Sequence, residues 1–150
     1  MTPYDHQIQL ANDGLAILKQ YGIAYLAAEE RTGKTLSAIL IAEQMKAKRI
    51  LVLTKKKALD GWHETLAAFT HTKDYVVTNY HQALKQTGQF DMVILDEAHN
   101  YISAFPKVGK IWREVAPLCK DVPILYLSAT PHAQGPQQLF HQFKLSSYSP

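Results

Sequence analysis

The sequence predicts an α/β fold in which helices cover both faces of a parallel β-sheet. Short apolar runs, each too short for a helix, alternate along the chain with longer segments whose apolar residues recur at helical spacing. This alternation is typical of a doubly wound sheet, because a chain must cross one face before it starts another parallel strand. Such crossovers are right-handed, so the carboxyl ends of all the strands should lie at one edge of the sheet.

The first half of the chain predicts helix, strand, helix and strand. Apolar residues on one face predict a helix over 8–18, and Tyr21 and Gly22 form a natural stop. The run 23–27 is expected to be the first strand. A helix should then reach about Ala47, and the run 50–53 should form a second buried strand.

The second half continues the same alternation. Leu59, Trp62, Leu66 and Phe69 lie at helical spacing, and Trp62 is more typical of a core residue than of a functional surface. The remaining segments are expected, in chain order, to be a strand at 75–77, a short helix at 79–85, a strand at 92–95, a helix at 111–118, a strand at 124–127 and a helix at 137–143.

The composition fits one globular domain. The 150 residues are enough for a core, and 47% hydrophobic with 19% charged residues is an ordinary balance. The net charge of +3 permits nucleic-acid binding without arguing for it. A single cysteine excludes an internal disulfide, and no leader or membrane-spanning apolar run is present, so the sequence predicts a soluble, cytoplasmic protein.

The segment Ala28–Thr35 has the groups that hold a triphosphate. It follows the first predicted strand and opens a helix, whose N-terminal N–H groups attract anions. Gly33, Lys34 and Thr35 add a lysine for the terminal phosphates and a hydroxyl for magnesium, in the required order. Ala28 replaces the usual first glycine of this pattern.

A pair of carboxylates follows the strand predicted at 92–95. Asp96 and Glu97 should therefore lie at the carboxyl edge of the sheet, where open α/β sheets bind ligands. In P-loop enzymes, an aspartate that follows such a strand holds magnesium, while another group orients the attacking water. The carboxylates and the phosphate loop together predict a nucleotide site.

The order of three motifs resembles a known family. With Gly33-Lys34-Thr35, Asp96-Glu97-Ala98-His99 and Ser128-Ala129-Thr130, nearly the whole chain resembles the first RecA-like domain of superfamily-two helicases and translocases. The resemblance implies a RecA-like P-loop NTPase domain, a three-layer sandwich with a mostly parallel central sheet. It further implies that residues 1–150 form a single ATP-binding domain, the N-terminal half of a two-domain motor whose second domain is absent from this sequence.

Weaker likenesses point to one branch of this family. Pro3-Tyr4 followed by Gln7, then Trp62, and then Asn79-Tyr80 resemble motifs of the Swi/Snf-like translocases of double-stranded DNA. The compact chain with its variant phosphate loop also looks like versions found in bacteriophage genomes, which would place it in the host cytoplasm.

The resemblance implies ATP and Mg²⁺ as ligands and a role for each matching residue. Lys34, Asp96 and Glu97 would be catalytic: the lysine neutralises the phosphates, Asp96 holds magnesium through water, and Glu97 positions and deprotonates the attacking water. Thr35 would ligate magnesium directly. The nucleotide-binding set would be Gln7, Glu30, Arg31, Thr32, Gly33, Lys34 and Thr35.

Other residues would couple hydrolysis to movement or contact the nucleic acid. His99, Ser128 and Thr130 would form the coupling set, although Ser128 and Thr130 also suit a helix cap before Pro131. The basic residues Lys55, Lys56 and Lys57 follow the second strand, so they are candidates for phosphate-backbone contact, with a solvated loop as the alternative.

The expected function is thus that of an ATP hydrolase, and the leading interpretation is a DNA translocase or helicase that acts on duplex DNA. The alternatives are an RNA helicase, which can carry the same Asp-Glu-Ala-His box, and a non-enzymatic module that binds nucleotide or nucleic acid. Relatives close a second RecA-like domain on ATP, and that domain supplies an arginine finger. We therefore expect little activity from this chain alone, and a second such domain from the same or another chain as its partner.

Overall fold

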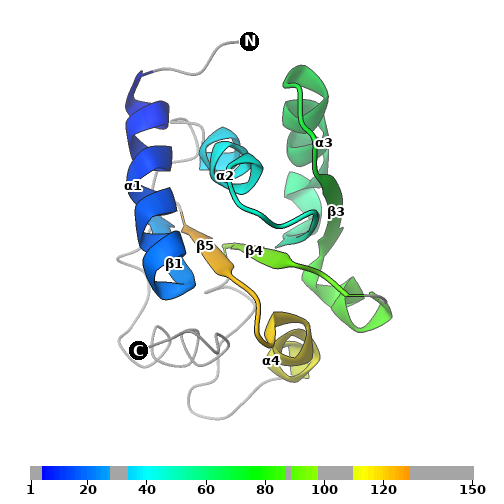
Figure 1. Ribbon diagram of the computed structural model, residues 1–150. Coiled ribbons are helices and arrows are strands. Elements are labelled where there is room, and N and C mark those ends of the chain that lie inside the picture. The colour runs from blue at the N-terminus through cyan, green and yellow to red at the C-terminus, as the bar shows by residue number, and fades with distance from the viewer. Residues whose placement is uncertain (1–4, 28–33, 87–88, 98–109, 129–150) are drawn as a thin grey trace.

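A five-stranded parallel sheet forms the centre of the computed structural model, which describes residues 5–27, 34–86, 89–97 and 110–128 (Figure 1). The strands are β1 (Ile23–Ala27), β2 (Arg49–Thr54), β3 (Asp74–Asn79), β4 (Met92–Asp96) and β5 (Ile124–Ser128). Their order across the sheet is β1-β5-β4-β2-β3, and every neighbouring pair is parallel. The predicted parallel, doubly wound α/β fold is confirmed.

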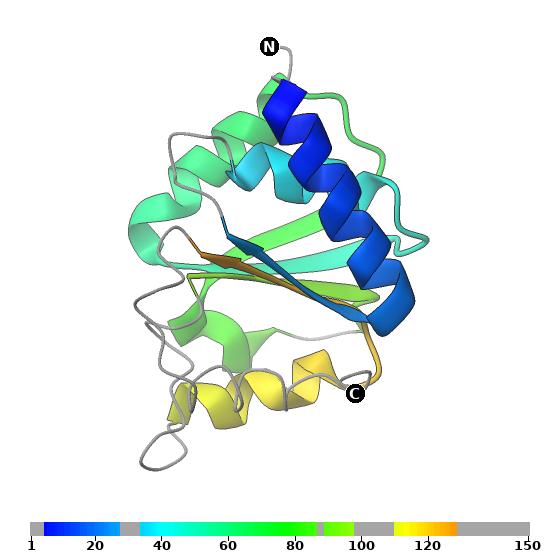
Figure 2. The ribbon, with the colours of Figure 1, turned by 90° about the vertical axis from the view of Figure 1, so that its left-hand side faces the viewer.

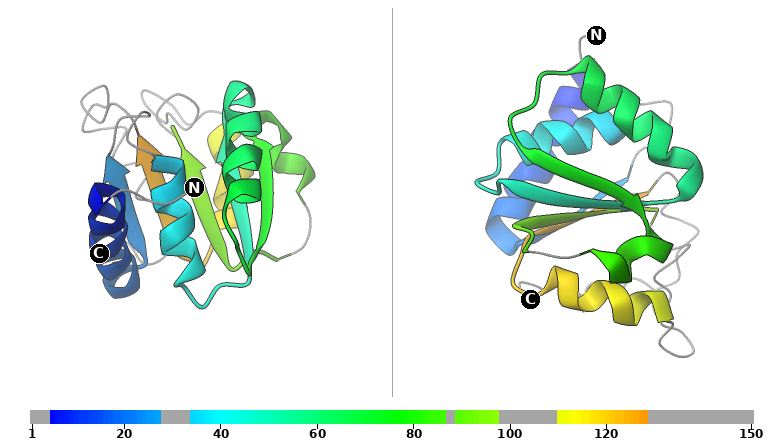
Figure 3. Two further views of the ribbon diagram at one scale, coloured as in Figure 1. Left: turned by 90° about the horizontal axis from the view of Figure 1, so that it is seen from above. Right: turned by 90° about the vertical axis from the view of Figure 1, so that its right-hand side faces the viewer.

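Helices cover both faces of this sheet and make the structure a three-layer sandwich (Figure 2). One layer contains α1 (Asp5–Tyr21), α2 (Lys34–Glu43) and α3 (Leu59–Ala68). The opposite layer contains α4 (Lys110–Val115) and the 3₁₀-helices η3 (Tyr80–Lys85) and η5 (Ala116–Cys119). Figure 3 shows the two layers and the twist of the sheet from two further sides.

Two predicted helices end earlier than expected. Helix α2 ends at Glu43 and not near Ala47, because Gln44 and Met45 tighten into 3₁₀-type bonds to Ile41 and Ala42 that turn the chain toward β2. Helix α4 ends at Val115 and continues as η5, since Pro117 has no N–H with which to extend an α-helix. The helix predicted at 137–143 lies outside the described residues.

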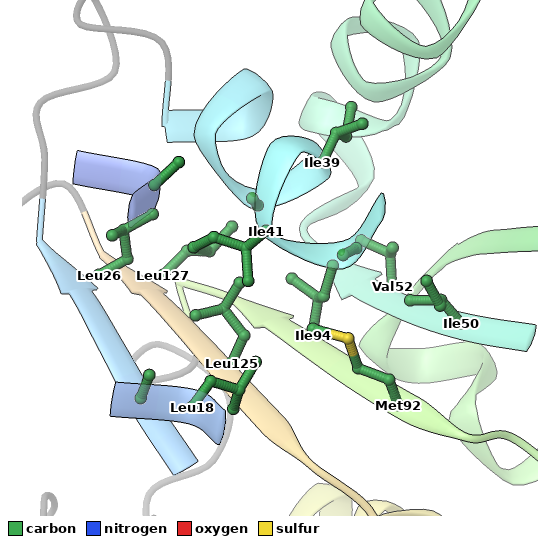
Figure 4. Packing of buried hydrophobic residues seen from close by; sticks show 14 of the residues in the cluster. Leu18, Leu26, Ile39, Ile41, Ile50, Val52, Met92, Ile94, Leu125 and Leu127 are labelled. Carbon is green, nitrogen blue, oxygen red and sulfur yellow. The ribbon is translucent and has the colours of Figure 1, made fainter. Parts of the chain in front are cut away.

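The core lies on both faces of the sheet, because β2, β4 and β5 are apolar and buried on both sides. Alternate residues of β4 point to opposite layers: Met92 and Ile94 pack toward α1, α2 and α3, whereas Val93 and Leu95 pack toward η3, α4 and η5. Figure 4 shows the first of these clusters. Within the described residues, no helix has both the length and the apolar character needed to span a bilayer.

Candidate active site

Thr54 and Asp96 lie side by side at the carboxyl edge of the sheet. The parallel register of β2 and β4 pairs Leu53 with Leu95, so these two residues come next on their strands. Both continue the alternate positions that point toward α2 and α3. The Thr54 hydroxyl donates a hydrogen bond of 2.7 Å to Oδ2 of Asp96, and both side chains are buried.

Lys34 opens α2 directly above these strand ends and meets both carboxylates. Its ammonium lies 3.1 Å from Oδ1 of Asp96 and donates a hydrogen bond to Oε1 of Glu97. Only 4% of Lys34, 2% of Asp96 and 4% of Glu97 is exposed. Burial lowers the pKa of the Lys34 ammonium, but the neighbouring charges and hydrogen bonds of Asp96 and Glu97 outweigh it and leave the pKa above its ordinary value.

Trp62 reaches the same carboxylate from α3. Its indole N–H donates a hydrogen bond of 3.2 Å to Oδ2 of Asp96, the oxygen that Thr54 also contacts. Trp62 is 1% exposed and packs in the core, as the sequence favoured, and it is also part of the site. The two oxygens of Asp96 therefore differ: Oδ2 accepts from two neutral donors, whereas Oδ1 faces the Lys34 ammonium.

Backbone contacts fix the turn that carries the two carboxylates. The buried Tyr80 hydroxyl donates a hydrogen bond of 2.8 Å to the Asp96 carbonyl oxygen. The Glu97 N–H donates to the Leu127 carbonyl oxygen at 2.8 Å and so ties the turn to β5. Glu97 has a φ of 54°, in the left-handed region. Burial is the main reason that the pKa of the Tyr80 phenol is well above its ordinary value, which keeps this donor protonated.

Ser128 ends β5 beside this turn and is fully buried. The alternation of β5 places it with Ile124 and Tyr126, toward the layer of α4 and away from that of Lys34. Burial raises the pKa of the Tyr25 phenol, and the neighbouring Ser128 side chain partly offsets this.

Of the other predicted site residues, some lie in the described part of the chain and some lie outside it. Thr35 follows Lys34 in α2 and is half-buried, and Gln7 lies in the first turns of α1. Lys55 is half-buried and Lys56 and Lys57 are exposed, at the carboxyl end of β2. The residues that lie outside the described part of the chain are Glu30, Arg31, Thr32, Gly33, His99 and Thr130.

The described residues fit a magnesium ion held partly by a ligand. They contain no cluster of three or more His, Cys, Asp or Glu side chains that could enclose a metal. Magnesium rarely needs one, because it is usually held by one or two carboxylates, waters and substrate phosphates. Asp96 and Glu97 supply carboxylate oxygens at this edge, with the Lys34 ammonium as the counter-charge between them.

Sequence reasoning named Lys34, Asp96 and Glu97, which the structure brings into contact. It did not name Thr54, and it did not name Tyr80 as a support for this cluster. A signal for Thr54 was present: it directly follows the apolar run of its strand, as Asp96 does. Polar residues that end neighbouring parallel strands meet at one edge, so comparing the strand ends would have paired the two.

Comparison with known proteins gives one family match. The model of the family described as "Type III restriction enzyme, res subunit" matches residues 61–133. This range contains Trp62, Asp96, Glu97 and Ser128 but not Lys34. A search of curated proteins gives no match.

Comparison with solved structures gives the fold. The SWI2/SNF2 ATPase core of Sulfolobus solfataricus in complex with dsDNA matches with a TM-score of 0.76 at 19% identity, over 98% of this chain and 36% of that one. A second structure, of the same core domain, matches with a TM-score of 0.71 at 18% identity, again over 98% of this chain and 36% of that one. A nuclease-deletion mutant of the Type ISP restriction-modification enzyme LlaGI, bound to a DNA substrate mimic, gives 0.55 at 17% identity over 87% and 18% of the two chains.

This chain thus spans about a third of the length of the SWI2/SNF2 cores that it resembles. The structural matches establish a RecA-like fold, and the family match adds a relationship in sequence over residues 61–133.

Proposed function

We propose that the chain is the ATP-binding, N-terminal motor domain of a DNA-dependent ATPase. The observation that carries this proposal is the buried cluster of Lys34, Asp96 and Glu97 at the carboxyl edge of the sheet. Three buried charges are costly to a fold, and groups so placed in an edge site are typical of catalytic machinery. A domain that never bound a phosphate would have no physical need for all three.

The chemistry follows from what each side chain can hold. Lys34 exchanges its carboxylate partners for the β- and γ-phosphates of ATP, and backbone N–H groups of residues 30–34 bind the phosphate oxygens. Thr35 and Asp96 would hold Mg²⁺, which when bound neutralises charge on the phosphates. Glu97 orients the attacking water and accepts its proton. Gln7 contacts the adenine, and catalysis is positioning plus electrostatic stabilisation.

The choice of DNA rests on the named relatives. One SWI2/SNF2 match is a complex with dsDNA, and LlaGI is bound to a DNA substrate mimic. Lys55, Lys56 and Lys57 lie at the same edge of the sheet as the nucleotide site and would contact the phosphate backbone. An RNA helicase remains the second candidate, and the nucleic-acid arms of the test below decide between them.

Hydrolysis requires a partner domain. A second RecA-like domain, from the same or another chain, would supply an arginine finger, which is worth about 10³–10⁵ in rate where it has been measured. His99, Ser128 and Thr130 would transmit the state of the nucleotide to that domain. The chain alone should therefore bind ATP and hydrolyse it poorly.

The test has a binding arm and a rate arm. The chain should bind a fluorescent ATP analogue in Mg²⁺, and Lys34→Ala or Thr35→Ala should weaken binding by about tenfold or more, since each removes a contact of at least 1.4 kcal/mol. Equal binding by all three proteins would favour a module that does not use ATP.

The rate arm measures ATP hydrolysis by this chain and by the product of its gene translated to the natural stop codon, each with duplex DNA, single-stranded DNA and RNA. Strong stimulation by duplex DNA in a product that contains a second RecA-like domain, abolished by Glu97→Gln, is the expected result. Stimulation by RNA alone would support the RNA helicase, and no stimulation by any nucleic acid would refute the motor function.

A further inference from the structure

The peptide group that joins Asp96 to Glu97 is bonded at both of its polar ends. Its carbonyl oxygen, on Asp96, accepts the 2.8 Å hydrogen bond from the Tyr80 hydroxyl. Its N–H, on Glu97, donates the 2.8 Å bond to the Leu127 carbonyl oxygen. Because a peptide group is planar, these two bonds together fix the orientation of the whole plane.

This orientation determines the backbone conformation of Glu97. Rotation of the peptide plane changes ψ of Asp96 and φ of Glu97 together, so a fixed plane holds Glu97 at its φ of 54°. A residue with a side chain ordinarily prefers a negative φ, and it stays in the left-handed region only where its surroundings hold it there. The shape of this turn therefore depends on the two bonds.

The same backbone directs the Glu97 side chain. Its carboxylate accepts a hydrogen bond from Lys34, and only 4% of the residue is exposed. A change of φ at Glu97 would move this carboxylate away from Lys34, because Cβ moves with the backbone. The Asp96 carboxylate, in contrast, has supports of its own, since two neutral side-chain donors bind its Oδ2. Loss of the Tyr80 bond should thus displace the carboxylate of Glu97 more than that of Asp96.

The Tyr80 hydroxyl is itself held in place. Tyr80 begins η3, and the Asn79 side chain caps this 3₁₀-helix by accepting a hydrogen bond of 3.1 Å from the Gln82 N–H. The Tyr80 ring is fully buried, in the cluster that also contains Leu95 and Tyr126. A packed ring on a capped helix keeps the hydroxyl at a defined place beside the turn.

We propose that Tyr80 is a positioning residue for hydrolysis: its hydroxyl holds the Asp96–Glu97 peptide so that the Glu97 carboxylate faces the attacking water. This inference rests on the proposed function, in which Glu97 orients that water and accepts its proton. Lys34 would hold the phosphates from α2, and its place there does not depend on the Tyr80 bond. The hydroxyl therefore contributes to the rate of hydrolysis and little to the affinity for the nucleotide.

The first measurement tests whether Tyr80 controls the contact between Lys34 and Glu97, and it needs no nucleotide. Denaturant unfolding of the 150-residue chain, of Lys34→Met, of Glu97→Gln and of the double variant gives the interaction energy of this pair. The same cycle is then repeated with Tyr80→Phe in all four proteins, which removes the hydroxyl and keeps the ring. The interaction energy should fall to less than about half, because the Glu97 carboxylate no longer lies against Lys34.

Tyr75→Phe is the matched control. Tyr75 lies near the opposite end of β3, and its hydroxyl donates a bond of the same length, 2.8 Å, to Glu43. This variant should lower the stability of the chain but leave the interaction energy of Lys34 and Glu97 unchanged. An equal fall of that energy with Tyr75→Phe and Tyr80→Phe would mean that general loosening of the fold is the cause, and it would overturn the proposal.

The second measurement compares rate with affinity in the product of the gene translated to its natural stop codon, with the nucleic acid that stimulates it most. Tyr80→Phe should lower the single-turnover rate of ATP hydrolysis by about tenfold to hundredfold, the scale of misplacing a reacting group by about 1 Å. The dissociation constant of a fluorescent ATP analogue in Mg²⁺ should change by less than about twofold. Tyr75→Phe should leave both quantities unchanged.

The outcomes separate this inference from the proposed function. If Tyr80→Phe keeps the full interaction energy of Lys34 and Glu97, or keeps the full rate in a protein that hydrolyses ATP, the hydroxyl supports only the fold. A loss of affinity as large as the loss of rate would also contradict the inference, since Tyr80 would then support the binding site as a whole. If the unsubstituted protein does not hydrolyse ATP, or if Lys34→Ala binds the nucleotide equally well, the proposed function itself is overturned and the role of Tyr80 in hydrolysis with it.

Discussion

Glu43 and Tyr75 join the end of α2 to the edge strand β3 through a hydrogen bond of 2.8 Å from the phenol to Oε2. The other carboxylate oxygen accepts from the Thr72 N–H at 2.7 Å and from the Thr72 hydroxyl at 3.0 Å. Burial raises the pKa of Glu43, but these hydrogen bonds outweigh it and hold the pKa below its ordinary value of 4.5. The ionised carboxylate is therefore what fastens α2 to this edge.

Replacing Glu43 by Gln should lower stability at neutral pH by about 1–2 kcal/mol, the scale of hydrogen bonds to a charged group that is partly exposed. A carboxyl with a depressed folded pKa stabilises the fold above its unfolded pKa, and this contribution is lost as pH falls through the folded pKa. The difference in stability between the two proteins should thus shrink as the pH falls below 4.5, the ordinary pKa of this carboxyl. Urea unfolding between pH 7 and pH 3 measures it, and a gap independent of pH would contradict the role of the charge.

Two helical glycines should respond to alanine in opposite directions. At Gly61 in α3 a Cβ would meet nothing within 4 Å, so Gly61→Ala should raise stability by about 0.5–1 kcal/mol through the helix preference of alanine. At Gly14 in α1 a Cβ would lie 2.9 Å from Cδ1 of Ile41 and 3.4 Å from Cδ1 of Leu26, both in the core. Overpacking of about 1–3 kcal/mol should exceed the helix gain there and lower stability.

Thermal and urea unfolding of the two alanine variants provide the comparison, and each is the control for the other. A gain in stability at both positions would mean that Ile41 can move aside without cost.

The single cysteine should be inert in the folded chain. Cys119 is fully buried, and burial raises the pKa of its thiol to about 12. Since the thiolate is the reactive form, an aromatic disulfide reagent at about pH 8 should label Cys119 only through unfolded molecules. The labelling rate should therefore rise with urea in parallel with the unfolded fraction. Rapid, complete labelling of the native chain would show that the layer of α4 and η5 opens locally.

The contributions of Lys34, Asp96 and Glu97 to the stability of the fold should depend on one another. Lys34→Met leaves Asp96 and Glu97 buried without their counter-charge, and loss of one partner from a buried ion pair costs about 3–5 kcal/mol. Adding Glu97→Gln to this variant should restore part of that loss, because one of the two uncompensated charges disappears. Denaturant unfolding of the wild type, both single variants and the double variant gives the interaction energy, and strict additivity would show that water already screens the cluster.

The strands and the charged core of the site could be predicted from sequence because their signals are local. Each buried strand is a continuous apolar run, and Lys34, Asp96 and Glu97 follow such runs in recognisable order. The end of α2 was misjudged by about four residues. The groups that hold Glu43 there, Thr72 and Tyr75, come from about 30 residues further on, so no nearby signal marks the position.

Trp62 illustrates the same limit for the site. Helical spacing correctly predicted that the indole is in the core, but its N–H meets Asp96 only because α3 lies over the end of β4. That contact depends on the packing of two segments that are 34 positions apart. Helical spacing therefore predicts that a residue such as Trp62 is buried, but it does not predict the hydrogen bond that its polar group makes.

The left-handed backbone at Glu97 implies a conflict between the stability of the fold and the proposed catalytic role of this residue. A residue with a Cβ at a φ of 54° typically bears about 1–3 kcal/mol of strain, which the bond from Glu97 N–H to Leu127 helps to maintain. Glycine or asparagine would relieve that strain and would also remove the carboxylate. Laboratory selection for thermal stability alone should therefore replace Glu97 early. Selection for catalytic rate should retain Glu97, so that stabilising substitutions would arise at other positions.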